Sequence, residues 1–141
     1  MKRWVVIVVF FALVAPLYAQ SELRPFEQAG RWGYRDAQGR IVIPAHYQIA
    51  HDFTAGGIAA VVDREGWAYI DRRGQIVIRP FPVDNGPDYF SEGVGRFRQK
   101  GKFGYFDERG KVVIPPRFDY AAPFSYGLAA VCMECTQRAD G

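Results

Sequence analysis

Two cysteines near the end of the chain, Cys132 and Cys135, form its sharpest local motif for chemistry. In a thioredoxin-like protein such a pair lies at the start of a helix, where a lowered thiol pKa makes it reactive. Here the pair follows an expected strand and has no strand–helix–strand context. We therefore expect a disulfide first, because the leader described below indicates export. Redox activity comes second, and a metal site is a distant third because two sulfurs do not complete a zinc site.

The two histidines, at positions 46 and 51, lie in one expected loop region. Zinc-binding histidines often have this spacing within a longer ligand set, but no thiol or carboxylate cluster completes the set here. We therefore expect neither a metal nor a cofactor. A polar ligand would still suit this loop, and the residues considered for binding are His46, Tyr47, His51, Phe81 and Tyr89.

The other candidate residues recur at a regular spacing in three copies of one sequence pattern. RWGYRD at 31–36, GWAYID at 66–71 and KFGYFD at 102–107 align, and each continues into a similar Asp-x-x-Gly stretch. Catalysis needs one site, whereas three copies of a turn explain three aspartates without chemistry. No nucleophile elbow, phosphate-binding loop or His-Glu-x-x-His motif is present, so we expect no enzyme. The repeated positions are interpreted as structural: Trp32, Tyr34, Asp36, Gly39, Trp67, Tyr69, Asp71, Gly74, Phe103, Tyr105, Asp107 and Gly110.

These three stretches resemble WG repeats, bacterial sequences named for a Trp-Gly pair that precedes Ile-Asp-x-x-Gly-Lys-x-Val-Ile-Pro. Trp32-Gly33 matches the name literally, whereas Trp67-Ala68 and Phe103-Gly104 are conservative departures. Arg79 stands where the second copy should have proline. The resemblance covers about residues 31–131 and implies a β-rich repeat module without a defined role.

The elements that position these residues are short strands. Aromatic residues alternate with a small residue in each copy, which predicts an extended strand. Each Asp-x-x-Gly predicts a type I turn with positive φ at the glycine, followed by a returning strand. A further strand in each copy, at 57–63, 93–99 and 127–133, should pair with the next aromatic strand where one follows. We thus predict an all-β antiparallel meander of about three three-stranded repeats, open and curved, with boundaries at 31–65, 66–101 and 102–135.

The two ends of this meander should differ. The first aromatic strand, 31–36, has no predicted strand before it, and the last strand, 127–133, has no aromatic strand after it. Two unlike free edges would remain, and exposed edges invite pairing. We therefore expect self-association through strand edges, or pairing with a partner strand.

The first residues have the layout of a secretory signal peptide. Lys2 and Arg3 precede an apolar run from Trp4 to Val14, and Ala19 is the expected residue before cleavage. The run is shorter than the roughly 20 residues that span a bilayer, so only an uncleaved leader would attach the chain to a membrane. We predict a signal helix at 1–19, a linker at 20–30, a tail at 136–141, and a periplasmic or extracellular location.

Charge and composition restrict the partners. The chain is 49% hydrophobic and 23% charged, which excludes wholesale disorder. Its net charge of +3 includes Lys2 and Arg3, so the mature chain is nearly neutral and offers no broad positive field for nucleic acid.

The combined features predict a non-catalytic module that binds another protein at the cell envelope. Carbohydrate or cell-wall binding through exposed aromatic rings is the alternative, and it gains support if Trp32 or Trp67 faces a groove. An enzyme that uses the cysteine pair is a third hypothesis. The loop at 79–89 is longer than its counterparts, which fits either a binding face or a neutral insertion.

Overall fold

The computed structural model describes residues 22–135, so the expected signal peptide and the tail at 136–141 lie outside the described residues. The described chain is all β, as predicted, and contains no helix. It therefore holds no helix long and apolar enough to cross a membrane.

Within residues 22–135, fourteen short strands form five small antiparallel sheets, with strand orders β1-β2-β3, β4-β5-β6-β7, β8-β9, β10-β11-β12 and β13-β14. The strands are β1 (Arg24–Gln28), β2 (Arg31–Arg35), β3 (Ile41–Tyr47), β4 (Ile49–Ala50), β5 (Ala59–Asp63), β6 (Gly66–Ile70), β7 (Ile76–Ile78), β8 (Pro82–Val83), β9 (Gly86–Pro87), β10 (Val94–Gln99), β11 (Lys102–Asp107), β12 (Val112–Phe118), β13 (Tyr120–Ala121) and β14 (Val131–Cys132).

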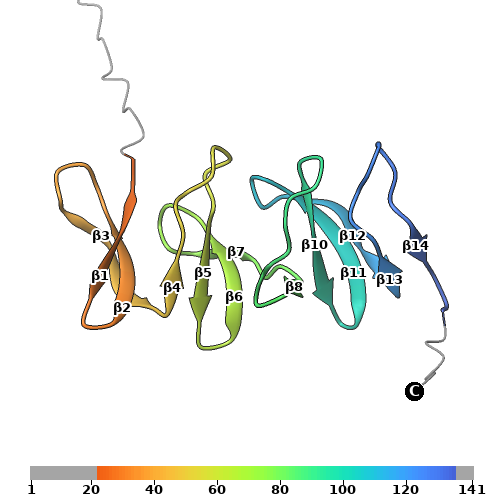
Figure 1. Cartoon of the computed structure of the whole chain (residues 1–141), viewed down its shortest axis with the longest axis horizontal. Helices are drawn as coiled ribbons and strands as arrows, with labels where there is room; N and C mark the ends of the chain where they lie inside the picture. Colours follow the sequence, from red (N-terminus) through yellow and green to blue (C-terminus); the bar gives the residue numbers. More distant parts are fainter. Residues whose placement is uncertain (1–21, 136–141) are drawn as a thin grey trace, which may run out of the picture.

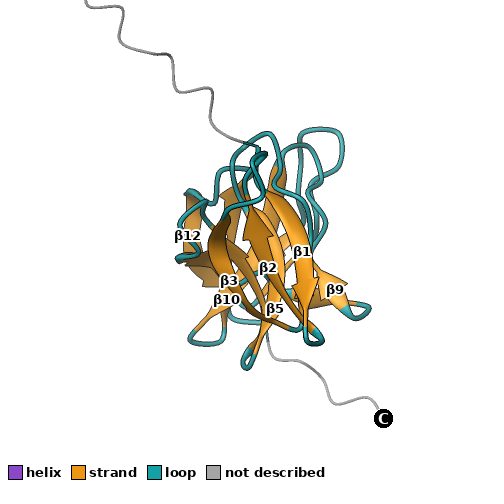
Figure 2. Ribbon diagram, turned by 90° about the vertical axis from the view of Figure 1, so that its left-hand side faces the viewer, coloured by secondary structure: helices purple, strands orange, loops and turns teal. Residues whose placement is uncertain are grey.

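The predicted pairing of each third strand with the next aromatic strand is confirmed for β5 with β6 and for β10 with β11. The predicted single meander is wrong in one respect, because the sheets are separate and stand one behind another along the long axis (Figure 1). Figure 2, which views the molecule from one end, shows the strands of successive sheets layered behind one another. The repeat therefore builds a stack of small sheets rather than one open, curved sheet.

The three larger sheets are called here the first (β1-β2-β3), the middle (β4-β5-β6-β7) and the third (β10-β11-β12). Stacking buries both faces of the middle sheet. On β5, Ala59 and Val61 pack toward the first sheet, whereas Ala60 packs toward the third. On β6, Ile70 faces the first sheet and Tyr69 the third. Coverage on both sides explains why Ala60 and Val61, which point to opposite faces of β5, are both buried.

The N-terminal end of the stack corrects two predictions. The segment assigned as a linker, 20–30, contains β1, which pairs with β2 along its whole length. The first aromatic strand therefore has no free edge on that side, and the reason given for head-to-tail edge pairing fails at this end. Self-association itself stays a prediction.

The sequence pattern did not predict β1, because this strand lies at the outer end of the stack and lacks the apolar residues of an inner strand. Arg24 lies opposite Arg35 in the first sheet, whereas the matching pair in the middle sheet is Ala59 and Ile70. The Arg35 guanidinium lies 6.0 Å from the Phe26 ring centroid. Charged residues on an outer face keep a stack soluble, and they remove the apolar pattern that marks an inner strand.

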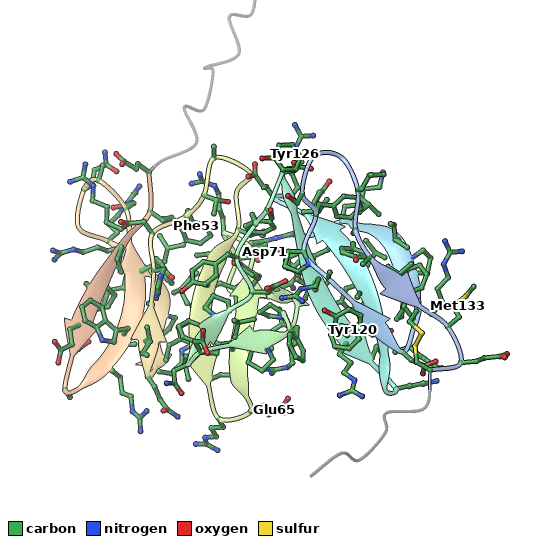
Figure 3. All side chains as sticks on the ribbon, turned by 45° about the vertical axis from the view of Figure 1, so that its right-hand side comes forward. Phe53, Glu65, Asp71, Tyr120, Tyr126 and Met133 are labelled. Atoms are coloured by element: carbon green, nitrogen blue, oxygen red, sulfur yellow. A yellow bond between two sulfur atoms is a disulfide. The ribbon has the colours of Figure 1, made fainter. Side chains whose placement is uncertain are left out.

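The opposite end is apolar. Leu128 is the counterpart of Ile58 in the repeat alignment, and it is 76% exposed whereas Ile58 is 2% exposed. Tyr120, Tyr126 and Met133 on this last unit, labelled in Figure 3, are also exposed. The two ends of the described stack thus present chemically different surfaces.

The predicted turns are confirmed. Gly39, Gly74 and Gly110 have φ values of 80°, 80° and 81°. One carboxylate oxygen of each turn aspartate accepts two backbone N–H groups at 2.8–3.0 Å. Burial acts to raise the pKa of Asp36, but hydrogen bonds from Arg40 and the turn amides outweigh it and lower this pKa. The repeated aspartates are therefore turn residues, as interpreted.

Two of the repeated tyrosines tie the aromatic strands β2 and β11 to the chain that follows. The Tyr34 hydroxyl donates to the His51 carbonyl at 2.7 Å, and the Tyr105 hydroxyl donates to the Ala122 carbonyl at 2.8 Å. Their rings pack on phenylalanines two residues after these carbonyls, with centroid distances of 4.9 and 5.0 Å. Such bonds satisfy the buried hydroxyls, which would otherwise destabilise the core.

These tyrosines predict a loss of stability at alkaline pH. Burial raises the pKa of Tyr34, Tyr47, Tyr69 and Tyr105, in Tyr69 to about 12. An unfolded tyrosine ionises near pH 10, so this contribution is complete below about pH 10 and is lost as the pH rises toward 12. Urea unfolding between about pH 8 and 11, with tyrosinate absorbance recorded in parallel, measures it. Complete ionisation near pH 10 in a still folded chain would contradict the prediction.

Candidate functional site

The middle copy departs from its neighbours at its returning strand. In the first and third copies this strand has seven residues and bulges across the aromatic strand. A Cβ atom on Gly104 would lie 2.6 Å from the Ile114 carbonyl oxygen and 2.8 Å from the Pro116 nitrogen. In the middle copy β7 has three residues and ends before Arg79, so Ala68 fits where the neighbours need glycine.

The chain then builds an inserted hairpin. The Phe81 amide donates to the Arg96 carbonyl at 2.8 Å, which joins the segment to β10 of the next sheet. Strands β8 and β9 follow, connected by Asp84 and Asn85, which both have positive φ. Positive φ at both positions is typical of a two-residue hairpin turn. The Asn85 carbonyl accepts a hydrogen bond from the Trp67 indole at 3.2 Å, so the hairpin covers the polar edge of that ring.

A buried ion pair holds the end of this insertion. The Arg96 guanidinium donates to both carboxylate oxygens of Asp88 at 2.7 and 2.8 Å, and these side chains are only 12% and 4% exposed. Arg96 also donates to the Ala121 carbonyl at 3.0 Å, and it lies over the Phe81 ring. Its hydrogen bonds to Asp88 raise the pKa of Arg96. The pair therefore fixes the insertion to the third sheet.

A groove of about 520 Å³ lies between the insertion and the middle sheet. Its aromatic residues include Trp67, Tyr69 and Tyr89, and the Tyr89 side chain is exposed. The His51 ring meets the Trp67 ring edge to face, with centroids 5.5 Å apart. The groove is lined by Ile49, His51, Asp52, Thr54, Ala60, Trp67, Tyr69, Asp84, Asn85, Gly86, Pro87, Asp88, Tyr89 and Phe90.

Two of the five residues considered for binding, His51 and Tyr89, line this groove. His46 does not, because its Nδ1 atom lies 2.7 Å from the Pro44 carbonyl and its ring packs on Tyr47. Tyr47 itself is buried in the first core cluster. Phe81 packs on Phe103 with ring centroids 4.9 Å apart.

The sequence did not indicate that Trp67 and Tyr69 have a second environment. Both were interpreted as structural positions, and they do pack against the core, but they also line the groove. Two signals pointed to this copy, the longer loop at 79–89 and Arg79 in place of proline. Neither signal says which side chains of the preceding strands face the inserted loop.

The cysteine pair lies at the far end of the stack. Cys132 and Cys135 form a disulfide, as expected, with Cα atoms 6.0 Å apart (Figure 3). No helix follows Cys132 within the described chain. Across residues 22–135, no three His, Cys, Asp or Glu side chains are grouped so that they could hold a metal ion.

The disulfide predicts a simple thiol measurement. The chain isolated under oxidising conditions should show no free thiol, and Cys132→Ser/Cys135→Ser should keep the β-sheet signal in circular dichroism. A bridge that closes so short a loop contributes about 2 kcal/mol to the free energy of unfolding. A rapidly alkylated thiolate at neutral pH would contradict this prediction and favour redox activity.

The stacked hairpins with their repeated turns define an all-β repeat protein. The family model for the WG containing repeat matches residues 32–67 and 103–134. These two stretches belong to that family, which confirms the resemblance found in the sequence. The matches leave out residues 68–102, which contain the inserted hairpin, whereas the groove lining from Ile49 to Trp67 lies within the first matched stretch. No curated protein and no solved structure matches the chain.

Proposed function

We propose that this chain is an exported, non-catalytic module that binds another protein at the cell envelope through the groove beside the inserted hairpin of its middle copy. One wall of the groove is the inserted hairpin, which belongs to the copy that departs from the repeat. The observation that carries the proposal is Tyr89, whose side chain is 71% exposed at the groove. Exposed tyrosine and tryptophan are typical of residues that dominate protein interfaces.

Export rests on the leader at 1–19, which has the layout of a secretory signal peptide. The absence of enzyme activity rests on the repeat, because the repeated aspartates serve turns and the cysteines are paired in a disulfide. A thiol-exchange assay on the full chain tests the hypothesis of an enzyme that uses the cysteine pair, and we expect no turnover.

Carbohydrate binding is the second candidate, and one observation favours it. Trp67 lines the groove and is half-buried, so part of its ring is open to a ligand. Aromatic rings of this kind stack on the apolar faces of sugars. Trp32 is less suited, since it does not line the groove.

Site-specific crosslinking in cells distinguishes these candidates. A photoreactive phenylalanine analogue at position 89 should give a discrete, protease-sensitive adduct. The same analogue at Glu27, which is exposed on β1 at the far end of the stack, provides the matched control. Adducts of equal strength at both positions would contradict the proposal, and a protease-resistant, glycosidase-sensitive adduct would favour the carbohydrate candidate.

A further inference from the structure

We infer that the groove binds a lysine or arginine side chain of the partner, seated against its aromatic rings and held by Asp52 and Asp84. This inference rests on the proposed function and names the chemistry that the groove recognises. It is carried by the charges, the rings and the hydrogen-bonding capacity of the lining residues.

The groove has uncompensated negative charge. Asp52 and Asp84 are exposed carboxylates that line it, and no ion pair to either is present among the described residues. Asp88 contributes no net charge because Arg96 neutralises it. None of the lining residues is Lys or Arg. A cation entering the groove would therefore meet attraction without competition from the protein's own cations.

Some carboxylates outside the groove have cationic partners. Asp36 pairs with Arg40, and Asp119 pairs with Lys102. Asp63 pairs with Arg79, which adds a hydrogen bond at 2.8 Å. Some carboxylates elsewhere, Glu27 and Asp107 among them, also have no ion pair among the described residues, so Asp52 and Asp84 are distinguished by their position at the aromatic groove.

The rings of the groove suit the same ligand. Elsewhere the chain places arginines over aromatic rings, with guanidinium-to-centroid distances of 5.3 Å for Arg98 over Phe103 and 5.1 Å for Arg117 over Phe118. The groove offers the half-buried Trp67 ring and the exposed Tyr89 ring, and none of its lining residues is a cation. Tryptophan and tyrosine are the rings that bind cations most strongly.

The hydrogen-bonding capacity of the two groove carboxylates suits a cation. Sugar hydroxyls donate and accept, whereas guanidinium and ammonium groups only donate. The two groove carboxylates only accept when ionised. The indole N–H of Trp67, a donor that a sugar would use, is already bonded to the Asn85 carbonyl.

Binding of short peptides to the full chain tests whether the groove prefers a cationic side chain. The probes are acetyl-Gly-Gly-Arg-Gly-Gly-amide, its lysine analogue and its citrulline analogue, with binding followed by tryptophan fluorescence and by NMR shifts. Citrulline keeps the shape of arginine but has no charge. We expect arginine and lysine peptides to bind about tenfold more tightly than the citrulline peptide, and binding to weaken with salt.

Two charge variants locate the effect. Asp52→Asn/Asp84→Asn should weaken binding of the arginine peptide about tenfold. Glu27→Gln removes an exposed carboxylate at the other end of the stack and should leave binding unchanged within about twofold.

Equal affinity for the arginine and citrulline peptides, or no effect of Asp52→Asn/Asp84→Asn, would overturn the inference. An absence of peptide binding in the chain that still crosslinks through position 89 would also overturn it, while leaving the proposed function intact. Loss of both the peptide binding and the position 89 adduct would contradict the two proposals together. Saturable binding of an N-acetylglucosamine tetramer that resists the Asp52→Asn/Asp84→Asn change would replace the cation with a glycan.

Discussion

Gly104→Ala should lower the free energy of unfolding by about 3 kcal/mol and the melting temperature by on the order of 10–20 °C. A Cβ atom here would lie 2.6 Å from the Ile114 carbonyl oxygen and 2.7 Å from the Phe97 ring. The bulge of β12 cannot recede freely, because Phe103 pairs with Phe118 beyond it. Urea unfolding followed by circular dichroism measures the change.

Gly101→Ala is the matched control for this variant. Gly101 lies in the turn before the same strand, has φ of 80° and would place its Cβ in open space. Its replacement strains only the backbone and should cost about 1 kcal/mol. Equal losses in the two variants would show that the bulge does not press on the aromatic strand, and would contradict the explanation given for Ala68 in the middle copy.

Arg96→Met should lower the free energy of unfolding by about 3–5 kcal/mol, because it leaves the Asp88 carboxylate buried without its cation. The guanidinium makes two charge-assisted bonds to Asp88 and one to the Ala121 carbonyl. Loss of these contacts releases the end of the insertion that forms the groove wall. Urea unfolding measures the loss of stability, and NMR shifts of the groove residues show whether the groove wall has moved.

Arg98→Met is the control on the same strand. Arg98 is exposed, donates to the Gly101 carbonyl and lies over Phe103, so its loss should cost about 1 kcal/mol or less. The double variant Arg96→Met/Asp88→Leu should recover much of the lost stability, because removing both charges leaves no unpaired ion in the core. A double variant no more stable than Arg96→Met would contradict the buried-charge explanation.

The local elements were predictable because their causes are local. Asp-x-x-Gly determines its own turn, since the carboxylate bonds to nearby amides and the glycine adopts positive φ without strain. The alternation in β6 likewise predicts an extended strand, because successive side chains point to opposite faces. The short links at 63–66 and 99–102 predicted the pairing of β5 with β6 and of β10 with β11, because a short link joins antiparallel neighbours.

The ends of the stack and the groove were not predictable on the same grounds. β1 carries Arg24 where an inner strand carries alanine, so its membership depends on the sheet that it flanks rather than on its own pattern. In the sequence Asp88 is one acidic residue in a polar loop, and only the fold brings Arg96 into contact with it. His46 and His51 are close in sequence, but only His51 lies at the groove.

The sequence by itself determined the hairpin units, their turns, the all-β class and the copy that departs from the repeat. Residues within a few positions of one another produce these features, through strand alternation and turn hydrogen bonds. Only the tertiary structure decided that the sheets stack separately and that Trp67, Tyr69 and Tyr89 share a groove with Asp52 and Asp84. Burial between sheets selects those contacts, and burial depends on which side chains meet across the stack rather than on their order in the chain.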